Sequence, residues 1–115
     1  MTDKAYFKSA ILTIGTYIPN TGKENELLKL VKEHQPALRE YGFLTDKPGF
    51  VAESQNGTII EVFEWTGLAA VEGAKQHPVI AAIWQKMHAI GDTPLLKNLQ
   101  EANEPFPGFN VLKFD

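Results

Sequence analysis

The 115-residue sequence contains no cysteine, which excludes disulfide bonds, thiolate catalysis and thiolate metal sites and fits a reducing compartment. It has no excess of positive charge either. Against 14 acidic residues stand 11 Lys and Arg, so the electrostatic footprint of a nucleic-acid-binding protein is missing. No apolar run approaches the roughly 18 residues of a membrane span, and "MTDKAYFKS" lacks the apolar segment of a signal peptide. We therefore expect a cytoplasmic protein that binds neither nucleic acid nor a membrane.

What is present is the composition of an ordinary globular protein, with 43% hydrophobic and 22% charged residues. A chain of this length buries roughly two thirds of its unfolded surface, which is enough for a core without covalent cross-links. No internal repeat, linker or low-complexity segment interrupts the sequence. We expect a single domain over residues 1–115.

The first third of the sequence predicts a strand and a helix. "SAILTIGTYI" (residues 9–18) is rich in β-branched and aromatic residues, which is typical of a strand. Thr21 and Glu24 have the spacing of a capping box, so a helix is expected to begin there. Gly42 is expected to end this helix, and Pro36 inside it predicts a kink.

The remainder predicts a hairpin, two helices and a last strand. "GFVAESQ" and "TIIEVFEW" flank Asn56-Gly57, a dipeptide that tolerates the positive φ angles of a tight hairpin turn. Helices are expected over residues 67–76 and 78–91, with Pro78 in the first turn of the second helix. In the tail, "TPLLKNL" is either extended or a single helical turn, "EANEPFPGF" is expected to be a loop, and "FNVLKF" is the expected last strand.

The order strand, helix, strand, strand, helix, strand predicts an α+β fold of the ferredoxin-like βαββαβ type, an antiparallel sheet with helices on one face. Strand alternation puts apolar side chains on the other face as well. In the first strand Leu12, Ile14 and Ile18 oppose Ile11 and Tyr17, and in "TIIEVFEW" Ile59, Phe63 and Trp65 oppose Ile60 and Val62. An apolar face left in water is typical of an interface, so we expect a homodimer whose sheets pack face to face.

Several segments carry a family resemblance: the first strand, "TIIEVFEW" with "GLAAVEGAKQHPVIAAIW" after it, and the tail "LQEANEPFPGFNVL". Trp65 at the end of its strand and the step His77-Pro78-Val79 are the most characteristic positions. Over roughly residues 9–114 the chain resembles the antibiotic biosynthesis monooxygenase-like family of dimeric α+β barrels. The resemblance implies a ferredoxin-like monomer, a dimer with sheets back to back, and a pocket between each sheet and its helices.

Activities in that family vary, because a fold does not determine a function. Its members include cofactor-free oxygenases of phenols and quinols, haem-degrading enzymes, isomerases and proteins without an assigned reaction. The haem-degrading pattern places a second tryptophan at Ala74 and the iron-binding histidine at Trp84, so both functional positions are lost here. His34, His77 and His88 do not have helical ligand spacing either. We expect no cofactor and no metal.

Oxygenation without a cofactor requires a base near neutral pH, donors for the substrate anion and an apolar cavity. Histidine is the side chain best suited to the proton step. His34 shares a helical stripe with Leu27, Val31 and Leu38, so it should face the sheet across the expected pocket. It is a candidate catalytic base. The alternative is a buried histidine satisfied by one hydrogen bond.

His77 lies at the break between two helical segments and is the second candidate base, with a helix-capping role as the alternative. His88 follows Trp84 by four residues and shares its helix face, which is either pocket or solvent-exposed surface.

The candidate substrate-binding residues are the aromatic and sulfur-containing side chains Trp65, Phe63, Trp84, Tyr17 and Met87. Core packing is the alternative role for the two tryptophans, Phe63 and Met87, and a solvent-facing hydroxyl is the alternative for Tyr17. Glu61 and Glu64 lie on opposite strand faces, so they cannot form the paired carboxylates of a glycosidase.

The sequence thus predicts a cofactor-independent monooxygenase that acts on a small aromatic, phenolic or quinol-type substrate in a pocket between sheet and helices. A non-catalytic small-molecule-binding protein of the same fold is the competing interpretation. An isomerase that shuttles protons in the same pocket is a third.

Overall fold

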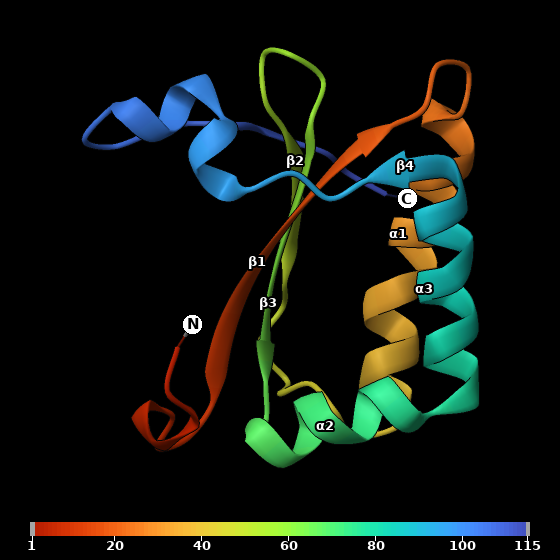
Figure 1. Ribbon diagram of the computed structural model, residues 1–115, viewed down its shortest axis with the longest axis vertical. Coiled ribbons are helices and arrows are strands. Elements are labelled where there is room, and N and C mark those ends of the chain that lie inside the picture. Colours follow the sequence, from red (N-terminus) through yellow and green to blue (C-terminus); the bar gives the residue numbers. More distant parts are fainter. Residues whose placement is uncertain (1, 115) are drawn as a thin grey trace.

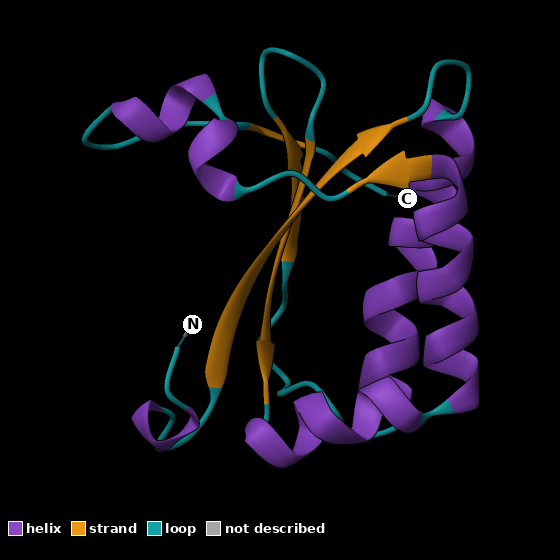
Figure 2. Cartoon of the chain, viewed as in Figure 1, coloured by secondary structure: helices purple, strands orange, loops and turns teal. Residues whose placement is uncertain are grey.

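The computed structural model describes residues 2–114, which form an α+β fold with a five-stranded antiparallel sheet and three α-helices (Figures 1 and 2). The strands are β1 (Ile11–Pro19), β2 (Phe50–Glu53), β3 (Ile59–Trp65), β4 (Gly91–Asp92) and β5 (Asn110–Val111). The helices are α1 (Glu24–Glu40), α2 (Leu68–Gln76) and α3 (Pro78–Ile90), with 3₁₀ turns η1 (Lys4–Tyr6), η2 (Leu96–Asn98) and η3 (Gln100–Asn103). The strand order β4-β1-β3-β2-β5 is compatible with a ferredoxin-like arrangement.

Helix α1 begins at Glu24, and its N-cap is Lys23, whose side chain makes no capping hydrogen bond. The predicted capping role of Thr21 is therefore wrong. Pro36 does not interrupt the helix, which continues to Glu40.

The end of α1 is the glycine stop that the sequence predicts. Gly42 has φ +78°, and its N–H donates to Arg39 O at 3.0 Å, while Phe43 N–H donates to Leu38 O at 3.0 Å. These two bonds form a Schellman motif, in which the left-handed residue satisfies the last helix carbonyls. The chain reverses here and leads to β2.

The predicted hairpin joins β2 to β3, with a turn that uses a single left-handed residue. Gly57 has φ +89°, whereas Asn56 does not have a positive φ. Gly57 N–H donates to Ser54 O at 3.1 Å and Ser54 N–H donates to Thr58 O at 2.9 Å. This is a type I turn followed by a left-handed glycine, a common alternative to the two-residue turn.

The two later helices lie where they are predicted, to within one residue, but the edge strand next to β1 does not. That strand is β4, directly after α3, whereas β5, within the predicted "FNVLKF", pairs with β2 at the opposite edge. Gly91 permits the first pairing, because a Cβ at this position would lie 2.8 Å from Ile18 O. A side chain would prevent this close approach of the two backbones.

Strand register confirms the predicted division of the sheet into two faces. One face packs against α1, α2 and α3, and its core includes Ile11, Leu27, Leu38, Ile59, Phe63 and Trp65. Figure 1 shows η2 and η3 on the opposite side of the sheet from α1 and α3. Thr16 Oγ1 donates to Pro94 O at 2.6 Å and ties the segment that leads to η2 to β1. The second face also has exposed apolar side chains, namely Leu12, Ile14, Phe50 and Val111.

Candidate functional site

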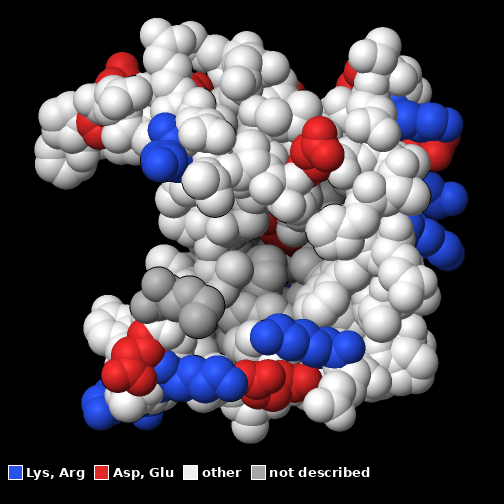
Figure 3. All heavy atoms as spheres, in the orientation of Figure 1, with Lys and Arg blue, Asp and Glu red and all other residues white. Residues whose placement is uncertain are grey.

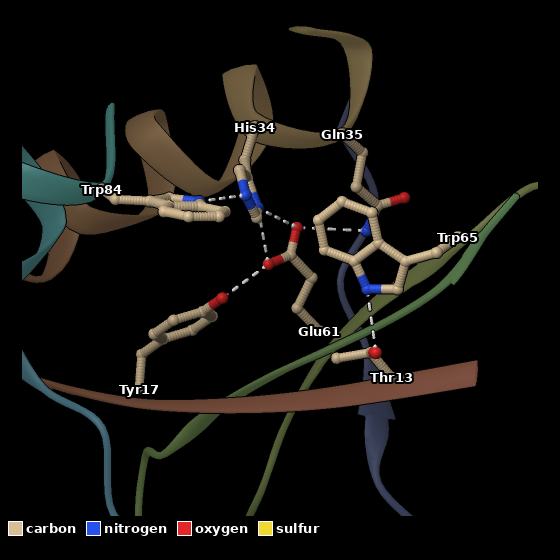
Figure 4. A network of polar contacts seen from close by, with 7 residues as sticks. All are labelled: Thr13, Tyr17, His34, Gln35, Glu61, Trp65 and Trp84. Atoms are coloured by element: carbon tan, nitrogen blue, oxygen red, sulfur yellow. Dashed lines mark hydrogen bonds and ion pairs between the residues drawn. The ribbon is translucent and has the colours of Figure 1, made fainter. Parts of the chain in front are cut away.

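The centre of the candidate site is Glu61, a carboxylate in the middle of the helix-covered face (Figure 4). Strand alternation directs Ile59, Glu61 and Phe63 to the same face, so a charged group lies between two core residues. The Glu61 side chain is 0% exposed. A buried carboxylate is stable only with hydrogen-bond donors or a counter-charge.

Three side chains from two elements donate to this carboxylate (Figure 4). His34 Nδ1 lies 2.9 Å from Glu61 Oε1 and 3.0 Å from Oε2. Tyr17 donates its hydroxyl proton to Oε1 at 2.8 Å, and Gln35 Nε2 donates to Oε2 at 3.2 Å. Within residues 2–114, every buried polar side-chain atom has a hydrogen-bond partner.

The tautomer of His34 follows from its second neighbour. Trp84 Nε1 lies 2.8 Å from His34 Nε2. An indole N–H can only donate, so His34 Nε2 accepts and the ring proton lies on Nδ1, directed at Glu61. Both nitrogens of this neutral imidazole are therefore occupied. We name the five residues Tyr17, His34, Gln35, Glu61 and Trp84 the Glu61 network.

Tyr17 reaches the carboxylate across a glycine. Gly15 is the residue of β1 directly opposite Glu61, and a Cβ at Gly15 would lie 3.0 Å from the Tyr17 hydroxyl oxygen. The missing side chain leaves room for the tyrosine to fold back over its own strand. Burial, the Glu61 charge and the hydrogen bond to Glu61 raise the pKa of Tyr17 well above its usual range, so Tyr17 is a neutral donor.

A pocket of about 370 Å³ adjoins the network. It is formed by β1, α1, α3 and the segment after α3, and the face seen in Figure 3 is hollowed near its middle. Its lining includes Tyr17 and Trp84, which are also the outer members of the Glu61 network, together with Leu27 and Met87. The titratable residues of the lining are Tyr17, His88 and Asp92. We name this space the β1–α3 pocket.

The structure divides the predicted site residues into two groups. Tyr17, Trp84 and Met87 line the β1–α3 pocket, and His34 contacts Trp84 behind its wall. Phe63 and Trp65 are both 5% exposed in the core and do not line this pocket.

The Trp65 indole and His77 make contacts of their own. Trp65 Nε1 donates to Thr13 Oγ1 at 2.9 Å. His77 Nδ1 accepts from Val79 N–H at 3.2 Å at the start of α3, and the His77 ring lies 4.0 Å from the Tyr41 ring. His77 therefore has the capping contact that was its alternative role.

Sequence reasoning missed the central residue. From the sequence, Glu61 is weighed only as half of a carboxylate pair with Glu64, although it occupies a core position of an apolar strand. A carboxylate at such a position requires a partner, and His34 on the apolar stripe of the preceding helix was the available one. The core position of Glu61 and the position of His34 on the apolar stripe together predict the contact between these two side chains. No comparable signal in the sequence points to Gln35 or to the close packing at Gly15.

Within the described part of the chain, no group of three or more His, Asp or Glu side chains is arranged to hold a metal ion. No helix of residues 2–114 has the length and apolar character that crossing a bilayer requires. Comparison of the chain with family models, with curated proteins and with solved structures found no match.

Proposed function

We propose that the protein binds a small aromatic, phenolic or quinol-type molecule in the β1–α3 pocket and oxygenates it without a cofactor. One observation carries the proposal. Tyr17 and Trp84 line an apolar pocket, and both also bind the buried network centred on Glu61 and His34. A volume of about 370 Å³ lies at the small end of the range for ligand pockets, which fits a molecule of one or two rings.

The proposed reaction needs only substrate and molecular oxygen. A hydroquinone and O₂ give a hydroxyquinone and water: the substrate supplies four electrons, one oxygen atom enters the ring, and the other leaves as water. The substrate must first lose a proton, because its anion is the electron-rich species that reacts with O₂. An apolar, water-poor pocket with fixed donors favours this step.

In this proposal the Glu61 network holds the pocket wall in place. His34 fixes the Trp84 indole, and Glu61 fixes the Tyr17 hydroxyl. His34 itself could accept a substrate proton only after Trp84 had left its Nε2 atom. His77 caps α3 at the end remote from the pocket.

We further propose that the protein is a homodimer of the dimeric α+β barrel type, in the cytoplasm, with the second sheet faces in contact. The support is the exposure of Leu12 (66%), Phe50 (58%) and Val111 (55%), which lie on β1, β2 and β5 of that face. Apolar side chains this exposed on one sheet face are typical of an interface. The resemblance to the antibiotic biosynthesis monooxygenase-like family supports the same arrangement.

A non-catalytic binding protein is the second candidate, and one specific observation favours it. Every buried donor and acceptor of the Glu61 network is satisfied within residues 2–114. A fully satisfied network rigidifies a core. Such a network can shape a ligand pocket without taking part in any reaction.

The test is oxygen consumption with a naphthohydroquinone, measured against its uncatalysed oxidation, with isotopically labelled O₂ to detect one oxygen atom in the product. Leu96→Trp, which fills the mouth of the pocket, should abolish the enzymatic rate, since Leu96 is 44% exposed and lines the pocket. Val79→Trp is the matched control, because Val79 is 42% exposed on α3 but outside the pocket.

A wild-type rate equal to that of buffer would refute the oxygenase. If anaerobic fluorescence titration still shows binding that Leu96→Trp removes and Val79→Trp retains, the binding protein is the correct candidate.

A further inference from the structure

The three histidines differ in whether a ring nitrogen is free to react. His34 uses both nitrogens, one toward Glu61 and one toward Trp84. His77 uses Nδ1 as the cap of α3 and lies outside the β1–α3 pocket. His88 is exposed, lines this pocket, and has no hydrogen bond, ion pair or ring contact with another residue of the described range 2–114.

His88 is placed to contact the polar end of a ligand in the pocket. It follows Trp84 by four residues in α3, so the two side chains share one helix face. An aromatic ring that lies against Trp84 and Met87 would place its substituent at the pocket rim, next to His88. Along the helix, His88 is about 16 Å from His77, so the two histidines cannot serve the same ligand atom.

His88 is the one imidazole in the lining of the β1–α3 pocket. His88 lies in the last turn of α3, where the carbonyl end of the helix dipole attracts a cation. Asp92 lines the same pocket and supplies a negative charge there. The remaining titratable group of the lining is Tyr17, which is engaged with Glu61. Imidazole is the side chain best suited to proton transfer near neutral pH, so His88 is the candidate base of this pocket.

We propose that His88 takes the hydroxyl proton from a phenolic ligand in the β1–α3 pocket. The O–H bond of the ligand breaks, its electron pair stays on oxygen, and the proton binds the free imidazole nitrogen. The products are a phenolate and an imidazolium, which form an ion pair at the pocket rim. The inference rests on the proposed function for the choice of a phenolic ligand, but the proton transfer requires no oxygen.

The experiment uses 4-nitrophenol, whose phenolate absorbs visible light and whose neutral form does not. The protein is titrated with this probe at a pH below the pKa of the free phenol, and tryptophan fluorescence reports binding independently. The compared proteins are the wild type, His88→Gln, and the matched control His77→Gln. Glutamine can still accept a hydrogen bond, but it cannot take the proton.

We expect a phenolate band from the bound probe in the wild type and in His77→Gln. In His88→Gln this band should fall about tenfold or more, while the dissociation constant changes less. Because His88 is exposed and makes no hydrogen bond or ion pair within residues 2–114, its replacement should leave the thermal unfolding temperature unchanged. The same phenolate band in His88→Gln, a wild type that binds only the neutral phenol, or no binding at all would overturn the inference.

Oxygen uptake separates this inference from the proposed oxygenase. A phenolate band that depends on His88, in a protein that consumes no O₂ with a naphthohydroquinone, supports the proton transfer and refutes the oxygenase. Oxygen uptake that is unchanged in His88→Gln, together with an unchanged phenolate band, supports the oxygenase and overturns the role of His88.

Discussion

The two faces of the sheet show opposite relations between polarity and burial. The helix-covered face holds the carboxylate of Glu61 with no exposed surface, surrounded by Tyr17, His34 and Gln35. The second face leaves Leu12 66% exposed and Phe50 58% exposed. The buried Glu61 and the exposed Leu12 thus belong to adjacent, paired strands, β3 and β1.

The two faces therefore obtain their stability in different ways. On the covered face a charge is tolerated because several donors replace water, so the arrangement depends on every partner. On the second face the chain buries Ile60 and Ala52 but leaves Leu12, Phe50 and Val111 exposed, so part of the available hydrophobic effect is unused within one chain. Each 100 Å² of apolar surface buried there by a partner would contribute roughly 2.5 kcal/mol, before the costs of association. The covered face should therefore be sensitive to small chemical changes, and the second face should not.

The largest effect is expected from Glu61→Ala. The substitution leaves the donors of Tyr17, His34 and Gln35 buried without an acceptor, since all three bind this carboxylate. We expect the free energy of unfolding to fall by about 3–5 kcal/mol, measured by urea denaturation.

Glu64→Ala is the control for that experiment, because Glu64 lies on the same strand but on the second face. Its side chain is 22% exposed, and Lys47 Nζ lies 3.5 Å from its carboxylate. A surface ion pair contributes up to about 1 kcal/mol, so this variant should stay close to the wild type. Equal losses in the two variants would show that the two faces do not differ.

The second face should respond in association rather than in folding. In Leu12→Lys/Phe50→Lys two exposed apolar side chains become charged, so the proposed dimer should lose affinity by about 100-fold or more, roughly 3 kcal/mol. Light scattering should then give the mass of one chain. Val79→Lys, at an exposed site away from the sheet, should leave the mass of the dimer. A wild type that is already monomeric at micromolar concentration would refute the dimer.

Much of the fold is predictable because its signals are local. Gly42 after a helical stripe, Asn56-Gly57 between alternating strands and Pro78 after His77 each determine a turn or a helix end through their own backbone preferences. The predicted last strand is present as β5, but the sequence does not predict β4 beside β1, since the pairing at Gly91 depends on contact with Ile18, far away in the sequence. The two residues of β4 carry no pattern of alternation.

The site is less predictable than the fold. Helical spacing correctly directs His34 to the sheet, and strand alternation correctly directs Glu61 to the same side. Periodicity gives a direction but not a distance, so it does not show that Trp84 occupies the second nitrogen of His34. It also cannot show that Phe63 and Trp65 pack in the core instead of lining the pocket.

An intermediate effect is expected from Trp84→Phe, which removes the indole N–H and leaves His34 Nε2 without its donor. The loss should be about 2 kcal/mol in the free energy of unfolding, from one buried hydrogen bond and some lost packing.

Trp65→Phe is the matched control on the same face, since it removes an N–H that binds the hydroxyl of Thr13. If His34 becomes available as a base, the phenolate band with 4-nitrophenol should rise in Trp84→Phe and not in Trp65→Phe. Stability unchanged in Trp84→Phe would show that its N–H contributes nothing to the network.

The smallest effect is a dependence of stability on alkaline pH, which the covered face should show through Tyr17. The pKa of Tyr17 is raised in the folded state above its usual value of 10.0, so above that pH the unfolded chain releases a proton that the folded chain keeps. The contribution is fully present below pH 10 and is lost as the pH rises, by about 1.4 kcal/mol for each further unit. Urea denaturation of the wild type should show this decline, and Tyr17→Phe should show less of it by that amount. Tyr41→Phe, which removes a hydroxyl from a residue 39% exposed, is the matched control. Identical alkaline slopes in the wild type and Tyr17→Phe would mean that the Tyr17 proton is not held by Glu61.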